Sequence, residues 1–409
     1  MLNKGTQQQP WGFTLRIRMN TYSVIMLGPN ASGKTVFLAS LYKKLSTQGD
    51  AGFFLEVDNG ETGHRLHDLY SEIAFGEDWP KPTFPNEIPE WTFTCRVQTK
   101  NLPIYSACRF TYIDYAGGRI TDYTEKENRE FYNKLQNADI ILGLLDGQRI
   151  ISLMQHQRLG SIWAINELPK MLSLMQKLGK PIQFVISKWD IVEDKYSLQE
   201  VLDLLLSIDE FKNLVQNCQK AGVPIRLIPV SAVGKGFATL QPDGSMLKTP
   251  GVLPKPFQVE LPLACVLPDL IQAEYHRLEK QEKEMKAAKT EVKANLNFFE
   301  QVGQIVGEGL KVVAEFVPAV VETFLPKKYE FATGSLQKMI YFTSELAQSS
   351  ANQKQELAQR RSEELRRERE QTLAQVADEQ TALTYALECF LLLQTELYKN
   401  FPESKIELP

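Results

Sequence analysis

Six apolar runs occur between Tyr22 and Ser231, each with the length and composition of a buried β-strand. Several are continuous rather than alternating, as expected for strands that helices cover on both faces. Helical patterns separate most of them, which predicts an α/β domain with a mainly parallel sheet. The runs are SVIMLG (23–28), TFTCRVQT (92–99), CRFTYID (108–114), DIILGLLD (139–146), IQFVIS (182–187) and IRLIPVS (225–231).

The second and third runs are joined only by KNLPIYSA, which is too short for a parallel connection. A parallel crossover needs about a dozen residues or more, whereas an antiparallel hairpin needs very few. The sequence therefore predicts a mostly parallel sheet that contains one antiparallel strand.

The character of the chain changes at residues 241–268, where six prolines indicate a linker or strap. Beyond it nearly all residues favour helix. Ile271, Leu278, Met285 and Val292 recur every seven residues, which is typical of a helix with one narrow seam for a partner.

Two charged helical runs, 270–293 and 346–376, flank an apolar stretch at 297–326. This order predicts an antiparallel helical hairpin with an apolar tip, and the apolar segment 383–398 is expected to pack back on its base. The tip is amphipathic and could meet either a membrane or protein. It lacks the Lys/Arg excess that anionic lipids attract, so a buried helix or a dimer interface is favoured over membrane contact.

Composition excludes several functional classes. The 409 residues carry a net charge of −4, which does not indicate a nucleic-acid-binding protein. The five cysteines are scattered and form no CxxC pair, so free thiols are expected and a zinc site is not. We find no signal peptide and no apolar stretch of about 20 residues that would span a membrane. We expect a cytoplasmic protein. Any contact with a membrane would be peripheral.

The segment GPNASGKT (28–35) fits the phosphate-binding pattern GxxxxGK[ST] and lies between a predicted strand and a predicted helix. Backbone N–H groups of such a loop, with the helix N-terminus, wrap phosphates. The Lys34 side chain is expected to reach the β and γ phosphates, and the Thr35 hydroxyl to bind Mg²⁺. The nucleotide-binding residues predicted here are Gly28, Asn30, Ala31, Ser32, Gly33, Lys34, Thr35 and Val36.

Three further segments follow in order, each where a predicted strand ends. DYAG (114–117) offers Asp114 for the Mg²⁺ shell and the Gly117 amide for the γ-phosphate. SKWD (187–190) is similar to the [NT]KxD motif, in which the carboxylate selects guanine. SAV (231–233) is similar to the loop whose backbone N–H meets guanine O6. The base-binding residues predicted are Ser187, Lys188, Trp189, Asp190, Ser231, Ala232 and Val233.

These four motifs, in this order, resemble the translation-factor-related class of P-loop GTPases, which includes the Ras-like proteins. The resemblance covers about residues 20–240 and implies a domain that binds GTP or GDP with Mg²⁺ and hydrolyses GTP. The expected organisation is a Ras-like G domain at 1–245, a linker or strap at 246–268 and a helical hairpin or bundle at 269–409. Residues 76–83 and the VELPLACVLPDLI segment also resemble the bacterial double-GTPase families of predicted conflict and defence systems.

The sequence departs from this class at two positions. Ser187 replaces the usual Asn or Thr, and Gly118 stands where many members place a water-orienting Gln. Arg119 is a candidate for stabilising transition-state charge, the alternative being a solvated switch residue. Thr83 is the predicted switch threonine that binds Mg²⁺ and the γ-phosphate, and Thr62 is the alternative.

The predicted function is a GTP-dependent switch in which the helical module couples nucleotide state to a protein partner or a homo-oligomer. Three alternatives stay open: a dynamin-like membrane GTPase that uses the apolar tip, a scaffold that binds nucleotide without hydrolysing it, and an ATPase of the same superfold.

Overall fold

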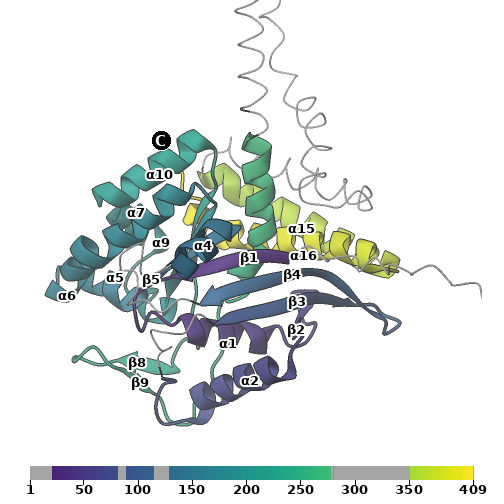
Figure 1. Ribbon diagram of the computed structural model, residues 1–409, viewed down its shortest axis with the longest axis horizontal. Coiled ribbons are helices and arrows are strands. Elements are labelled where there is room, and N and C mark those ends of the chain that lie inside the picture. Colours follow the sequence, from purple (N-terminus) through teal and green to yellow (C-terminus); the bar gives the residue numbers. More distant parts are fainter. Residues whose placement is uncertain (1–20, 82–88, 115–128, 278–279, 281–350, 409) are drawn as a thin grey trace, which may run out of the picture.

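The computed structural model describes residues 21–81, 89–114, 129–277, 280 and 351–408. The architecture is a seven-stranded sheet with helices on both faces (Figure 1). The order across the sheet is β2-β3-β4-β1-β5-β6-β7. The strands are β1 (Thr21–Leu27), β2 (Phe54–Val57), β3 (Glu90–Gln98), β4 (Ile104–Asp114), β5 (Ile140–Asp146), β6 (Ile182–Ser187) and β7 (Ile225–Pro229).

The strand directions confirm the predicted sheet. All neighbouring strands from β4 to β7 run parallel, whereas β3 is antiparallel to both β2 and β4. All six predicted strands are present, and the sequence analysis missed only the four-residue β2 of this sheet. Because β1 lies between β4 and β5, the order of the strands reverses beside it, and ligands of open α/β sheets bind at such a point.

Alternate side chains of the central strands face two separate cores. Val24 and Met26 of β1 point into the first core, and Ile25 and Leu27 point into the second. This double burial explains why the central strands are continuous apolar runs. The second core is covered by α4 (Arg129–Asn137), α5 (Gly147–Met154), α7 (Leu168–Leu178), α9 (Leu198–Leu206) and α10 (Asp209–Ala221). Short helical segments complete this side: α6 (Arg158–Ile162), a π-helix (Trp163–Glu167) and α8 (Trp189–Val192).

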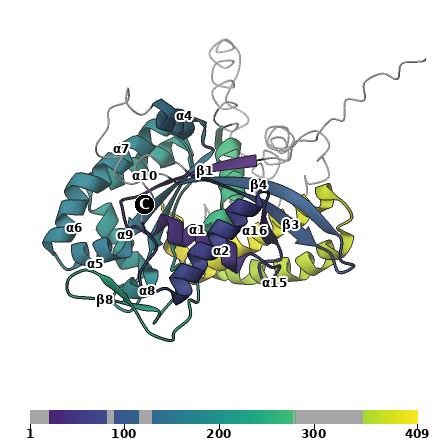
Figure 2. The same cartoon turned by 60° about the horizontal axis from the view of Figure 1, so that its bottom comes forward.

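The first core is covered by helices from both ends of the chain. They are α1 (Lys34–Lys44), α2 (Gly60–Phe75), α11 (Leu261–Ala264), the helical residues 266–277, α15 (Ala351–Gln375) and α16 (Glu379–Asn400). A 3-10 turn at Pro402–Ser404 follows α16. Figures 1 and 2 show α15 and α16 side by side, and α16 packs on β4.

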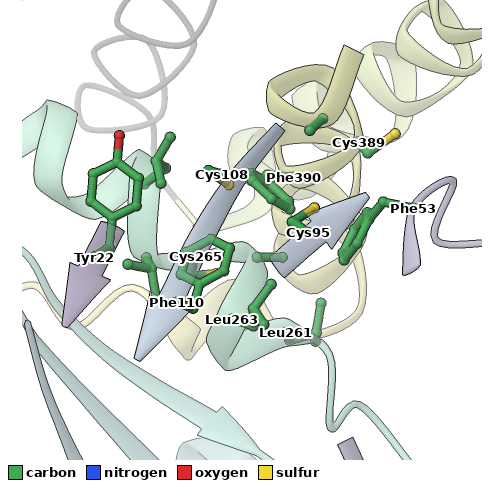
Figure 3. Close-up of a cluster of buried hydrophobic side chains, with 14 of the residues drawn as sticks. Tyr22, Phe53, Cys95, Cys108, Phe110, Leu261, Leu263, Cys265, Cys389 and Phe390 are labelled. Atoms are coloured by element: carbon green, nitrogen blue, oxygen red, sulfur yellow. The ribbon is translucent and has the colours of Figure 1, made fainter. Parts of the chain in front are cut away.

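Aromatic side chains carry the contact between α16 and the sheet (Figure 3). The ring centroid of Phe390 lies 5.0 Å from that of Phe53 and 6.0 Å from that of Phe110, both in edge-on geometry. Such pairs add to the free energy of burial. Residues 383–398, predicted to pack back on the base of the hairpin, lie within α16 and pack on both α15 and the sheet. The predicted apolar tip, 297–326, lies outside the described residues.

Residues 246–268, predicted as a linker or strap, have two structural roles. The first residues form β9 (Met246–Lys248), which pairs with β8 (Ala238–Leu240) in a separate antiparallel hairpin. Residues 259 and 261–267 are buried in the first core beneath the sheet (Figure 3). The division of the chain into domains stays a prediction, but the sheet, this segment and α16 share one hydrophobic core.

A buried ion pair also ties these parts together. The Arg226 guanidinium of β7 pairs with the Asp269 carboxylate, and each side chain is 1% exposed. Gln183 of β6 donates to the same carboxylate at 3.0 Å, and Arg226 donates to the Tyr398 hydroxyl of α16. Within the described parts of the chain, none of the helices combines the length and apolar character that crossing a membrane requires.

Candidate nucleotide-binding site

The loop between β1 and α1 turns sharply back on itself. Ala31 and Gly33 have φ values of 62° and 88°, in the left-handed region that favours glycine. At Gly28 a Cβ atom would lie 2.9 Å from the Ser32 hydroxyl oxygen and 3.0 Å from Leu144 Cβ, so only glycine fits. The Ser32 hydroxyl is buried and has no hydrogen-bond partner among the described residues. The loop is thus held in a tight curve with its polar groups at the N-terminus of α1.

Lys34 lies within this curve. Its ammonium group donates to the carbonyl oxygens of Gly28 and Pro29, both at 3.1 Å, and the residue is 8% exposed. Burial lowers the pKa of Lys34, and the negative charge of Asp114 opposes that shift. Among the described residues, two carbonyl oxygens and one carboxylate face this buried cation, which is suited to an anionic ligand.

Thr35 and Asp114 meet because β1 and β4 are parallel neighbours whose carboxyl ends lie at the same edge. The Thr35 hydroxyl donates to the Asp114 carboxylate at 3.1 Å. Hydroxyl and carboxylate oxygens suit Mg²⁺, which in nucleotide sites takes one or two protein ligands and completes its shell with water and phosphate. No group of three or more ligating His, Cys, Asp or Glu occurs within the described ranges. The pair therefore fits a metal shared with phosphates rather than a site made of protein alone.

The predicted base-binding residues lie at the next two strand ends. Asp190 accepts a hydrogen bond from the Ser231 hydroxyl at 2.6 Å, and that hydroxyl accepts from the Gly234 N–H at 2.7 Å. Burial raises the pKa of Asp190, while the hydrogen bond from Ser231 opposes the shift. Ser231 therefore fixes the direction of the carboxylate and, through Gly234, the shape of the following loop.

Lys188 adopts a left-handed conformation, with φ of 54°. Its ammonium group pairs with the Asp146 carboxylate at 2.9 Å, which holds the aliphatic stem against the site. The Ser187 hydroxyl donates to the Leu145 carbonyl oxygen at 3.3 Å, so it braces β6 on β5. The shorter side chain at 187 thus contacts the neighbouring strand.

One cavity of about 410 Å³ contains both ends of the site. This size lies within the range of pockets for small ligands. The predicted nucleotide-binding residues that line it are Asn30, Ala31, Ser32, Gly33, Lys34, Thr35, Val36, Ser187, Lys188, Asp190, Ser231, Ala232 and Val233. Gly28 shapes the loop from behind. The motifs for phosphate and for base thus face one space, although about 150 residues separate them along the chain.

Trp189 is placed differently from the others. Its indole is 3% exposed and packs in the second core, edge-on to Phe401 with 6.2 Å between ring centroids. The side chain is not part of the cavity wall, so it does not shield a base there. Thr83, Gly117 and Arg119, the predicted catalytic residues besides Lys34, lie outside the described residues, and their roles stay predictions.

The sequence analysis missed several residues that line or support the cavity. Asp146 was visible as the polar end of an apolar run, but it was not recognised as the partner of Lys188. The Asp243–Gly244 dipeptide is typical of a hairpin turn, although the predicted elements include no hairpin there. The cavity-lining residues without a predicted role are Phe37, Trp79, Pro80, Lys81, Leu144, Gln148, Val185, Val230, Gly244, Ser245 and Met246.

The decisive observation for the fold is the phosphate loop at the carboxyl end of β1, in a sheet with a single antiparallel strand. The fold is that of a P-loop G domain of the Ras-like type. An α-helical module follows the G domain and packs on its sheet.

No family model and no curated protein matches the chain. Three solved structures resemble it with low sequence identity and low TM-scores. A probable GTP-binding protein, EngB, is 15% identical, with 51% of this chain and 88% of that chain covered and a TM-score of 0.27. Translation elongation factor SelB from Methanococcus maripaludis, in complex with the GTP analogue GppNHp, is 15% identical, with 52% and 30% covered and a TM-score of 0.24. A variant of Era from Aquifex aeolicus, bound to GDP·AlF4⁻, is 16% identical, with 62% and 67% covered and a TM-score of 0.29. These scores are low, so the assignment of the G-domain fold follows from this chain's own strand order and phosphate loop.

Proposed function

We propose that this protein binds Mg-GTP in the 410 Å³ cavity and hydrolyses it to GDP, acting as a guanine-nucleotide switch. The observation that carries the proposal is the position of two charges in that cavity. The Lys34 ammonium lies beyond the carboxyl end of β1, and the Asp190 carboxylate lies beyond that of β6, with β5 between the two strands. A ligand that places a triphosphate at Lys34 and a purine at Asp190 suits both charges.

At the phosphate end, the ligand would replace contacts that the loop now makes with itself. The Lys34 ammonium would exchange the carbonyl oxygens of Gly28 and Pro29 for β- and γ-phosphate oxygens. Backbone N–H groups of the loop and the N-terminus of α1 would add further donors. Thr35 and Asp114 would hold Mg²⁺, which neutralises charge on the phosphates when it is bound.

At the base end, the Asp190 carboxylate is an acceptor and therefore selects a base with two donors on one edge. Guanine presents N1–H and the N2 amino group there, whereas adenine presents an acceptor at N1 and no amino group at C2. The Ser231 hydroxyl keeps the carboxylate in position, and the stem of Lys188 offers an apolar surface to the ring face.

The base preference is tested by calorimetry with GDP, GTP and ATP on the purified protein. We expect GDP and GTP to bind and ATP to bind far more weakly. Asp190→Asn should weaken GDP binding roughly 10- to 150-fold, because a hydrogen bond to a charged group contributes about 1.5–3 kcal/mol. Xanthosine diphosphate should lose less affinity or gain some, because its C2 carbonyl accepts from the new amide. Equal affinity of the wild type for ATP and GTP would contradict guanine selection.

Hydrolysis is tested by a single-turnover assay with [γ-³²P]GTP and Mg²⁺. We expect slow release of labelled phosphate, on the order of 10⁻⁴ to 10⁻² s⁻¹, as for G domains without a partner protein. Thr35→Val, which removes one Mg²⁺ ligand and keeps the side-chain shape, should release phosphate more slowly still. Label that stays on the nucleotide after many hours would support the non-hydrolysing scaffold instead.

The proposed coupling to a partner or a second copy is supported by the packing of the helical module. α16 lies on β4, the strand that ends at Asp114. If the end of β4 shifts when the γ-phosphate is lost, α16 would therefore move with it, and α15 would move with α16.

A further inference from the structure

The β8–β9 hairpin stands apart from the seven-stranded sheet, beside the C-terminal end of α2 (Figures 1 and 2). It begins shortly after the Ser231–Val233 loop. Phe237, at its base, is buried with Val233 and packs edge-on against Trp79, with 6.0 Å between ring centroids. The hairpin is therefore anchored to the loop that is predicted to meet the base.

The turn of this hairpin forms part of the cavity wall. Gly244, Ser245 and Met246 line the cavity together with Trp79 and Gln148. Their side of the cavity is the base side, because Gln148 follows the Asp146 that pairs with Lys188. Gly147, between them, packs so closely that a Cβ atom would lie 2.5 Å from the Ser187 carbonyl oxygen.

Two hydrogen bonds hold the turn of the hairpin over the cavity. The Gln148 side-chain amide donates to the Gly244 carbonyl oxygen at 2.6 Å. The Trp79 indole N–H donates to the Met246 carbonyl oxygen at 2.7 Å. Both acceptors are backbone atoms, so neither bond uses the Met246 side chain, whereas the Ser245 hydroxyl donates to the Asp243 carboxylate at 2.7 Å.

Lys248 ties the hairpin to the segment that leads into the predicted switch loop. Its ammonium group donates to the carbonyl oxygens of Glu72, Gly76 and Asp78 at 3.0, 2.9 and 2.6 Å. Glu72 lies in the last turn of α2, and Gly76 and Asp78 lie just beyond its end. The ammonium also lies 5.1 Å from the centroid of the Trp79 ring, which fixes the ring by a cation–π contact. Lys248 itself does not line the cavity.

We propose that the β8–β9 hairpin and Trp79 form the nucleoside-binding wall of the cavity. This inference rests on the proposed function. Met246 and Trp79 supply apolar surface for the purine and ribose, while Gln148 and Lys248 position that surface. The wall contacts nucleoside and not phosphate, so it governs retention of GDP without affecting a ligand that consists of phosphate alone.

The test compares GDP with pyrophosphate, which can occupy only the phosphate end. Met246→Ala removes a contact, and Lys248→Met removes a support that lies outside the cavity. We expect both variants to bind GDP roughly tenfold more weakly and to release a fluorescent GDP analogue correspondingly faster. Met246→Ala loses an apolar contact with the nucleoside, and Lys248→Met loses the charge that positions the Trp79 ring. Pyrophosphate affinity should be unchanged. Leu247→Ala is the matched control, because this side chain lies in the same strand, is 60% exposed and does not line the cavity.

The possible outcomes separate the two claims. If the wild type binds GDP and both variants match it in affinity and release rate, the proposed role of the hairpin is wrong while the proposed function stands. Equal losses for GDP and pyrophosphate would also overturn it, since they would indicate damage to the whole cavity. If the wild type binds no guanine nucleotide, the proposed function fails and the wall fails with it. Thermal unfolding shows whether each variant is folded. If Met246→Ala does not fold, Lys248→Met alone provides the test.

Discussion

Lys34→Met is expected to weaken GTP and GDP binding by at least about 30-fold while the protein stays folded. Lys34 is 8% exposed and has Asp114 as its charged neighbour, so a phosphate there would bind the ammonium group in a largely desolvated setting. Removing one partner of such a buried charge pair costs about 2–5 kcal/mol of binding free energy. Isothermal calorimetry with Mg-GDP measures the change.

Stability should respond in a different way to the same substitution. Burial already disfavours the charged form of Lys34, and methionine keeps the length of the stem without a charge. We therefore expect the unliganded variant to unfold at the wild-type temperature or slightly above it. Lys44→Met is the control, because Lys44 lies on the same helix but pairs with Glu260 at 2.8 Å, outside the cavity. Wild-type GDP affinity in Lys34→Met would contradict the phosphate role of this residue.

Asp269→Ala is expected to lower the free energy of unfolding by about 3–5 kcal/mol, because it leaves the Arg226 charge buried without its partner. Arg226 is 1% exposed and lies against the helical residues 266–277 and α16, so its charge is almost fully desolvated. Gln183 loses an acceptor at the same time. Urea unfolding followed by circular dichroism gives the difference.

A double variant separates loss of the pair from loss of its buried volume. Replacing a buried ion pair with apolar residues of similar size is often neutral, so Arg226→Met with Asp269→Leu should recover most of the stability. GDP affinity should be unaffected in both variants if they are folded, because Arg226 lies near the start of β7 and Ser231 lies beyond its end. A single variant within about 1 kcal/mol of the wild type would show that the pair is not the main anchor of the module.

The sequence by itself determined the elements whose causes are local. Continuous apolar runs specify strands that are buried on both faces, and a connection of a few residues can only join antiparallel neighbours. The conformation of 28–35 depends on glycines within the segment. For this reason six strands, the antiparallel β3 and the phosphate loop could be predicted, and so could most of the residues that line the cavity.

The tertiary structure decided everything that depends on partners far away in the chain. A four-residue β2 has too little pattern to detect, and it is a strand because β3 offers it a paired edge. Trp189 is next to Asp190 in sequence, but Phe401 and the second core take its side chain away from the cavity. Likewise the prolines of residues 246–268 predict a linker, yet its later residues are buried because α16 covers them. Burial and hydrogen bonding between such distant segments are set by the whole packed core, so no local pattern of residues can specify them.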